Sequence, residues 1–328
     1  MQDLLEKLAK TFGPSSKEDR VKNLIKEELK AYELKEDKLG NLVYHFSHDG
    51  PKLMLSAHLD SIGVIVTDVD KNGLIRFAPV GGLREVSIFG SDILFESGVR
   101  GTVYCDDNDA LQYKKELKMN KLFIDIGAKS KKEALNSVNI GMEGVFFPNF
   151  SILDGRAISP SMDDRSGCAV LVELIKNLKI KNLRYDLYVV FTVEEEIGVK
   201  GARTSTYDIT PDYGIAIDVT SCFDYIEPRL SVVELGKGPA VKVMDGGMIT
   251  NIELRNKVIE VAEKNKIPYQ LDVKTGGATD AMAMQVAKEG VKAAVISIPT
   301  RYVHSKGEVV DLSDVKNTVA LLKSFIEK

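Results

Sequence analysis

The three consecutive glutamates Glu194, Glu195 and Glu196 directly follow an apolar run that reads as a buried strand. A buried strand that ends in three carboxylates carries negative charge that hydrophobic burial cannot offset, so we expect something cationic to meet it there. Two other segments of the chain offer metal-binding side chains, one at His58 and one at His304. Together they indicate a metal site of which the glutamate cluster forms one half.

The other candidate side chains lie at or beyond the ends of apolar runs. His58 and Asp218 each close such a run, and His304 lies six residues past another. Ligands of open α/β sheets gather outside the carboxyl ends of the strands, which is where these runs would deliver the three side chains. A further pair, Asp163 and Asp164, precedes a predicted helix.

Each motif taken alone has a simpler explanation. A histidine and an aspartate two apart at a strand end, such as His58 and Asp60, can satisfy backbone groups. Asp163 and Asp164 can be an N-cap and an acidic first turn. A solvated surface would explain any single one of these motifs. It explains poorly a set of strand ends that each close with Asp, Glu or His, in a chain with only four histidines.

Composition bounds the class of protein. The 328 residues suffice for a sizeable core and suggest two domains. With 44% hydrophobic and 28% charged residues the chain reads as globular, and no apolar run reaches the ~18 residues of a membrane span. A net charge of -4 without a polybasic block argues against a nucleic-acid partner. We expect neither nucleic acid nor membrane as a partner.

The first residues of the chain and its cysteines bear on the cellular compartment. The first residues lack the basic start and long apolar stretch of a signal peptide, so we expect a cytoplasmic protein. Three scattered cysteines argue against a disulfide framework and a cysteine-rich zinc site. We expect them to be reduced packing residues.

The elements that must position these side chains alternate along most of the chain. Short apolar runs at 52–57, 185–191, 213–217 and 293–298 predict strands. Helical spacing predicts helices at 16–32, 164–177, 251–264, 280–288 and 313–326, the first opened by Ser16-x-x-Asp19 as a capping box. This alternation predicts an α/β sheet covered on both faces.

The stretch from about residue 64 to 153 reads differently. It is rich in β-branched and aromatic runs punctuated by glycine, which predicts a small β domain inserted into the α/β domain. Within it, Asp68-Val69-Asp70-Lys71-Asn72-Gly73 resembles the start of a calcium loop, but Pro79 stands where that loop needs a bidentate glutamate. Asn72-Gly73 between apolar runs instead predicts a hairpin turn.

Six motifs occur in order, and together they resemble the tetrahedral (TET) aminopeptidase family of co-catalytic metallopeptidases, which includes glutamyl and deblocking aminopeptidases. The motifs are Ala57-His58-Leu59-Asp60-Ser61-Ile62-Gly63, Met162-Asp163-Asp164-Arg165, Thr192-Val193-Glu194-Glu195-Glu196-Ile197-Gly198-Val199-Lys200-Gly201-Ala202, Ala216-Ile217-Asp218-Val219-Thr220, Gly277-Ala278-Thr279-Asp280-Ala281 and Pro299-Thr300-Arg301-Tyr302-Val303-His304-Ser305. The resemblance spans nearly the whole chain.

The resemblance implies a fold and a division of the chain. The fold would be an α/β, mixed-sheet catalytic domain of the zinc-peptidase (phosphorylase/hydrolase-like) type, with a smaller inserted β-barrel-like domain. The catalytic domain would comprise residues 1–63 and 154–328, and residues 64–153 would form the inserted dimerisation domain.

The resemblance also implies the roles of individual residues. Two divalent ions would share Asp163, the first also held by His58 and Asp218 and the second by Glu196 and His304. Glu195 would be the general base, and Asp60 would orient His58 through the other ring nitrogen. A cis peptide bond would follow Asp163. Zinc, cobalt and manganese all accept such mixed histidine and carboxylate ligands.

We therefore expect a metal-dependent aminopeptidase that trims free N-termini of peptides and assembles through dimers into a hollow tetrahedral dodecamer. The alternatives are a deacylase or dipeptidase on the same site, an endoglucanase, and a non-catalytic assembly protein. Two departures from the family pattern bear on substrate preference and assembly. Ser61 stands where a glutamate is more common, and the segment 82–86 lacks the usual tryptophan.

Overall fold

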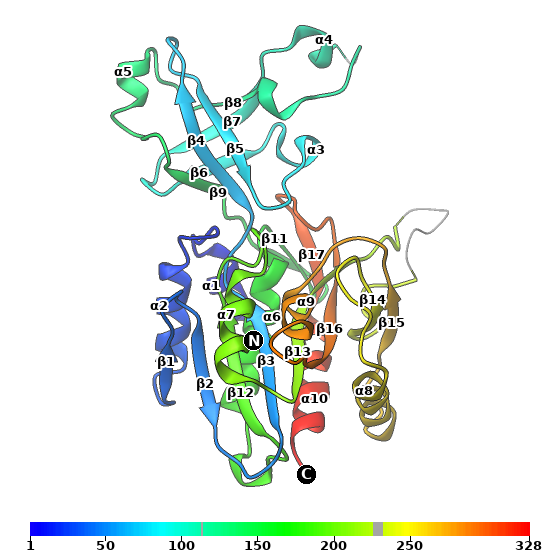
Figure 1. Cartoon of the computed structure of the whole chain (residues 1–328). Coiled ribbons are helices and arrows are strands. Elements are labelled where there is room, and N and C mark those ends of the chain that lie inside the picture. Colours follow the sequence, from blue (N-terminus) through cyan, green and yellow to red (C-terminus); the bar gives the residue numbers. More distant parts are fainter. Residues whose placement is uncertain (113, 226–231) are drawn as a thin grey trace.

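The computed structural model describes residues 1–112, 114–225 and 232–328. Its larger part is built on one mixed sheet of eleven strands, and a closed six-stranded barrel projects from one end of that sheet (Figure 1). This is the predicted α/β layering with an inserted β-rich part.

The long sheet path runs β1-β2-β12-β3-β13-β16-β17-β11-β10, and β14 adds to β16 and carries β15. The central pairs β12–β3, β3–β13 and β13–β16 are parallel, whereas β16–β17 and the outer pairs on the main path are antiparallel. The strands are β1 Leu34–Glu36, β2 Leu42–Phe46, β3 Lys52–His58, β10 Ser151–Leu153, β11 Arg156–Ser159, β12 Asp186–Thr192, β13 Tyr213–Ser221, β14 Ala240–Met244, β15 Gln270–Val273, β16 Lys292–Arg301 and β17 Glu308–Asp311.

Helices cover both faces of this sheet, because its central strands are apolar on both sides. Alternate residues of β3 show this, since Leu53 and Leu55 join one buried cluster and Met54 joins another. The first face carries α1, α2, α6, α8 and α10, and the second carries α7 and α9. The helices are α1 Gln2–Lys10, α2 Asp19–Glu28, α6 Met162–Lys176, α7 Lys200–Ile209, α8 Ile252–Lys264, α9 Asp280–Gln285 and α10 Leu312–Ile326.

The barrel strands lie between β3 and β10 in the chain and pair in the order β4-β5-β8-β7-β6-β9. The predicted Asn72-Gly73 turn is confirmed: it joins β4 to β5, and Gly73 has the positive φ of 88° that such a turn requires. The strands are β4 Gly63–Val69, β5 Ile75–Val80, β6 Asp92–Phe95, β7 Arg100–Cys105, β8 Leu122–Asp125 and β9 Glu143–Phe146, with short helices α3 Glu85–Ile88, α4 Asn108–Leu111 and α5 Lys131–Ala134.

Two of the predicted helices are shorter in the structure. The helix predicted at 16–32 spans only Asp19–Glu28, and Ser16 does not cap it, because the Ser16 hydroxyl instead donates to Glu143 at 2.9 Å. The helix predicted at 280–288 ends at Gln285. The prediction for the cysteines is confirmed, since all three are free and buried.

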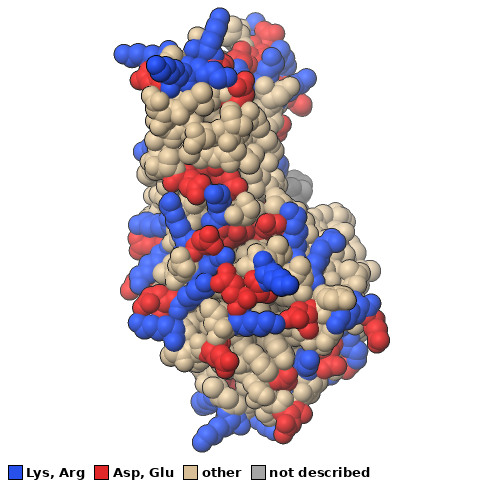
Figure 2. All heavy atoms as spheres, turned by 60° about the vertical axis from the view of Figure 1, so that its left-hand side comes forward, with Lys and Arg blue, Asp and Glu red and all other residues tan. Residues whose placement is uncertain are grey.

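Figure 2 shows acidic and basic side chains intermixed over one face of the sheet part, with a broad uncharged area on the barrel above it. None of the described helices is both long and apolar enough to cross a bilayer.

Candidate metal centre

Strand register brings three of the motifs to one edge of the sheet. β3 and β12 are parallel neighbours, and Thr192 pairs with His58, so the glutamates that follow Thr192 lie beside the end of β3. On the other side of β3, Ala216 pairs with Ser56. Asp218, two residues further along β13, is therefore level with His58.

Asp163 reaches the same place from the start of α6, on the first face of the sheet. Ser161 before it has a left-handed φ of 64°, Asp163 and Asp164 depart from helical geometry, and the peptide bond between them is cis. The N-cap interpretation is nevertheless confirmed for Asp164, whose Oδ1 accepts the backbone N–H of Gly167 at 2.9 Å. It does not describe Asp163, whose carboxylate contacts two histidines. The turn presents Asp163 to the sheet edge.

Asp163 faces two histidines with its two carboxylate oxygens. Oδ1 lies 3.0 Å from His58 Nε2, and Oδ2 lies 3.2 Å from His304 Nε2. Asp218 Oδ1 lies 3.9 Å from the same nitrogen of His58, and Glu196 Oε1 lies 3.2 Å from that of His304. Two groups of three possible ligands thus share Asp163. Within each group, the three ligand atoms lie within 4.8 Å of one another.

Both histidines are held in the same way. His58 Nδ1 lies 3.0 Å from the backbone oxygen of Asp60, and His304 Nδ1 lies 3.0 Å from that of Gly82. A carbonyl can only accept, so each ring donates through Nδ1 and turns Nε2 toward the carboxylates, where a neutral ring would offer its lone pair to a metal ion. Metal-binding histidines show this pattern. Gly82 is needed for it, because a Cβ there would lie 2.8 Å from the His304 ring.

The cluster brings several carboxylates together in a buried place, where uncompensated negative charge is unfavourable. Burial, followed by repulsion from Asp163, raises the pKa of Asp218 well above its ordinary value. Burial lowers the pKa of His304, but its ion pairs with Asp163 and Glu196 outweigh this and raise the pKa to about 12. Glu196 Oε1 is buried, and among the described residues its one polar contact is the ion pair with His304, whose geometry is not that of a hydrogen bond. These residues fit a pair of cations.

The three adjacent glutamates have different surroundings. Glu194 forms an ion pair with Lys200 at 2.9 Å, and Glu196 joins the metal group with His304. Among the described residues none hydrogen-bonds to the Glu195 carboxylate. Burial raises the pKa of Glu195 well above its ordinary value, and Asp218 and Glu196 add to the rise while His58 opposes it.

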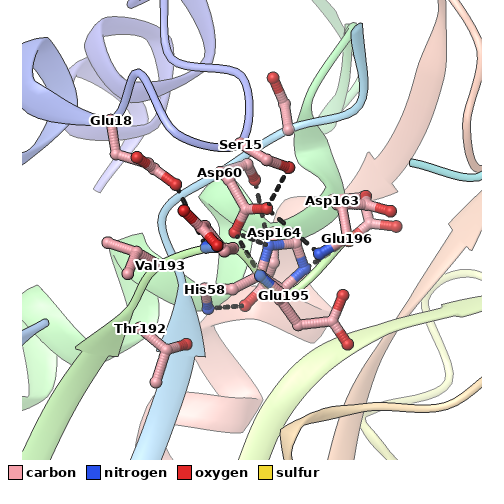
Figure 3. Close-up of polar contacts among 12 residues, drawn as sticks. Ser15, Glu18, His58, Asp60, Asp163, Asp164, Thr192, Val193, Glu195 and Glu196 are labelled. Carbon is pink, nitrogen blue, oxygen red and sulfur yellow. Dashed lines mark hydrogen bonds and ion pairs between the residues drawn. The ribbon is translucent and has the colours of Figure 1, made fainter. Parts of the chain in front are cut away.

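Asp60 holds the peptide from which two of these glutamates project (Figure 3). Its Oδ1 accepts the backbone N–H of Glu195 at 3.0 Å, and its Oδ2 accepts that of Glu196 at 3.1 Å. The Ser15 hydroxyl also donates to Oδ2, at 2.7 Å. The carboxylate lies 3.5 Å from His58 Nδ1, farther than the Asp60 backbone oxygen.

Four residues around the site had no role in the sequence analysis: Ser15, Glu18, Asp280 and Glu308. Glu18 Oε1 accepts the backbone N–H of Glu194 at 3.1 Å, and Asp280 Oδ2 accepts the Thr192 hydroxyl at 2.7 Å. Asp280 stands in one of the six motifs, which was a signal for it. Glu308 lies four residues after His304, outside the six motifs, and nothing in the sequence indicated that it contacts the site.

A cavity of about 700 Å³ opens beside the cluster. Asp163, Asp218 and His304 form one side of it, and Phe223, Val273 and Lys274 are among the residues on the others. Burial lowers the pKa of Lys274 to about 8. The cavity has room for a peptide end next to the candidate ligands.

Comparison with known proteins places the chain in a family. Residues 40–321 match the family described as M42 glutamyl aminopeptidase. The lysyl aminopeptidase of Pyrococcus furiosus is 38% identical over 99% of this chain and 96% of its own.

Solved structures of other proteins are similar to this chain over nearly its whole length. One, described as the Pyrococcus horikoshii TET1 peptidase that can assemble into a tetrahedron or a large octahedral shell, has a TM-score of 0.90 and 33% identity, over 100% of this chain and 99% of its own. Another, described as an endoglucanase of Thermotoga maritima, has a TM-score of 0.82 and 30% identity, over 98% and 96%. The chain belongs to the M42 glutamyl aminopeptidase family and is a metallopeptidase of that family, an aminopeptidase that hydrolyses peptide bonds.

Proposed function

We propose that this aminopeptidase removes residues from the free N-termini of peptides at a pair of divalent ions that share Asp163. His58 and Asp218 would complete the first ion's ligands, and Glu196 and His304 the second's. The observation that carries the proposal is the placement of Asp163 between the two histidines, one carboxylate oxygen toward each.

The donor set fits such a pair. Three ligand carboxylates contribute three negative charges against the four positive charges of two divalent ions, so a net positive charge remains. When bound, the ions would supply Lewis acidity, polarising the scissile carbonyl and lowering the pKa of a shared water. Three protein ligands each would leave room for water and substrate. Zinc is our first choice, and cobalt and manganese suit the same ligands.

Glu195 would act as the general base. It would take a proton from the attacking water and pass it to the amine of the departing peptide, as a carboxylate close to the reacting atoms can. Its freedom from hydrogen bonds among the described residues leaves its oxygens available for this transfer. Asp60 would keep the backbone of Glu195 in place, and Glu194 would stay neutralised by Lys200.

The other candidate functions differ in what the site would have to do. A glycosidase needs two carboxylates facing each other across a bond, roughly 5 to 9.5 Å apart, and has no use for the two histidines. A non-catalytic assembly protein would not need to keep all five ligands and the base. A deacylase or dipeptidase would use the same ions and base, so only the substrate separates it from our proposal.

We also propose that the chain assembles with itself, through dimers into a tetrahedral dodecamer, with the barrel as the dimerisation part. The support is the tetrahedral assembly described for the Pyrococcus horikoshii peptidase and the broad uncharged area on one face of the barrel (Figure 2). Light scattering of the purified protein should give twelve times the chain mass of 36.1 kDa. A monomer mass would contradict the assembly.

The test of the function uses protein stripped of metal, to which zinc, cobalt or manganese is returned. We expect release of p-nitroaniline from aminoacyl-p-nitroanilides and none from their N-acetylated forms. Release from the acetylated forms instead would favour a deacylase. No release with any metal, although two ions bind per chain, would contradict the proposal.

A further inference from the structure

Glu308 joins two distant parts of the chain through one buried carboxylate. Its Oε2 accepts the backbone N–H of Asp163 at 3.0 Å, across 145 residues of sequence. Its Oε1 accepts the backbone N–H of His304 at 2.7 Å. Glu308 is only 2% exposed, so water cannot readily replace it in either hydrogen bond.

Strand pairing fixes where this carboxylate lies. Glu308 is the first residue of β17, and it pairs with Ser159 of β11, four residues before Asp163. β17 also pairs with β16, so the segment that carries His304 is the connection between these two strands. Glu308 therefore stands where the chain leading to Asp163 and the loop carrying His304 come together.

Both segments have backbone conformations that need support. Ser161 has a φ of 64°, and His304 itself has a φ of 62°. Residues other than glycine rarely adopt such left-handed angles, and they keep them only when their surroundings enforce them. The two hydrogen bonds to Glu308 fall on or next to these two turns and restrain both from a single side chain.

Only a carboxylate meets this geometry. Two backbone donors converge on one side chain, so each of its two terminal atoms must be an acceptor. A glutamine has one acceptor and an NH2 group that would face a second N–H donor. An aspartate has two acceptors, but it is one methylene shorter and cannot reach both segments from the same backbone position.

We propose that Glu308 is a positioning residue that sets the separation of Asp163 and His304, and that the ion held by Asp163, Glu196 and His304 depends on it. The inference rests on the proposed two-ion site. It adds Glu308 to that site as a residue that contributes no ligand atom. Groups that hold metal ligands in place typically change metal affinity by ~10–100-fold when they are mutated.

The experiment titrates metal-free protein with cobalt(II) chloride and follows heat and the visible spectrum of the bound ion. We expect two ions to bind to the parent chain. Glu308→Gln should bind the first ion, and its second ion should bind at least ~10-fold more weakly, with an altered cobalt spectrum. Glu308→Gln binding both ions with the affinities and spectrum of the parent would overturn the inference.

Asp314 offers a matched control. It is a buried carboxylate on α10 that accepts two backbone N–H groups, those of Gly236 and Gly238, both at 2.7 Å. Asp314→Asn should lower the melting temperature about as much as Glu308→Gln but leave both cobalt affinities unchanged. Equal losses of cobalt affinity in the two variants would show that general destabilisation is the cause and would also overturn the inference.

A second variant covers the case in which Glu308→Gln does not fold. Glu308→Asp keeps the charge and loses the reach, so it should show the same weak second ion. Cobalt binding like that of the parent would contradict our inference. A parent chain that bound fewer than two ions would instead count against the proposed function, so the two failures can be told apart.

Discussion

The carboxylate of Asp60 accepts the backbone N–H of Glu195 at 3.0 Å, although 135 residues separate them in the chain. The same carboxylate accepts the N–H of Glu196, the next residue. A side chain two residues after His58 thus holds both the candidate base and one of the candidate ligands. The Asp60 backbone oxygen meanwhile accepts from His58, so one residue restrains three members of the site.

Asp60→Asn should therefore slow catalysis more than it weakens substrate binding. Asparagine has one acceptor oxygen in place of two, so one of the two glutamate amides loses its partner. We expect kcat to fall by ~10–100-fold with a small change in KM, measured on an aminoacyl-p-nitroanilide. Ser15→Ala, which removes only the third hydrogen bond to Asp60, should have a smaller effect. An unchanged kcat in Asp60→Asn would contradict this role.

Gly167→Ala should destabilise the protein, although alanine favours helices over glycine by ~1 kcal/mol. A Cβ at this position of α6 would lie 2.4 Å from both carboxylate oxygens of Asp164. Asp164 in turn accepts the backbone N–H groups of His58 and Gly167, at 3.3 and 2.9 Å. Overpacking of this kind costs about 1–3 kcal/mol, which exceeds the gain in helix propensity.

Urea unfolding measures this change, and Gly276→Ala is the control. A Cβ on Gly276 would meet no atom within 4 Å. We expect a lower midpoint for Gly167→Ala and little change for the control. A Gly167→Ala protein as stable as the parent would mean that Asp164 can move without cost.

Glu18 should make stability depend on pH. Burial, followed by repulsion from Asp60, raises the pKa of Glu18 from 4.5 to about 7. The folded chain therefore keeps a proton that the unfolded chain releases between pH 4.5 and 7. The stabilisation is complete below pH 4.5 and declines as the pH rises to about 7, by an amount on the order of 3 kcal/mol.

Glu18→Gln removes this titration, so the variant should gain stability relative to the parent as the pH rises from 5 to 7. Urea unfolding of both proteins in EDTA at several pH values measures the difference. Parallel stability curves across this window would show that Glu18 is already ionised in the folded protein at pH 5.

The sequence predicted the central strands well because their chemistry is local. The apolar runs at β3, β12 and β16 end beside motif residues, and the structure has strands at all three. The order of strands is not local. β12 lies between β2 and β3 in the sheet, although β2 and β3 are consecutive in the chain, and no local pattern reveals this insertion.

The same distinction applies to the site. His58, Asp163, Glu196, Asp218 and His304 have side chains of metal-binding types within recognisable motifs, and the structure brings them together. Glu308 and Ser15 have no such signature, because they act through hydrogen bonds to segments far away in the sequence. Ser16 was expected to cap a helix, and its actual partner, Glu143, is 127 residues away.

The two adjacent glutamates have different proposed functions, Glu195 as the general base and Glu196 as a metal ligand. The most direct measurement is kcat on an aminoacyl-p-nitroanilide together with the bound metal per chain, for Glu195→Gln and for the control Glu194→Gln. We expect Glu195→Gln to retain two ions and to lose at least ~100-fold in kcat, as loss of a general base does. Glu194→Gln should keep both ions and the kcat of the parent, because the Glu194 carboxylate pairs with Lys200 and not with a candidate ligand. Near-normal turnover in Glu195→Gln with both ions bound would rule out Glu195 as the general base.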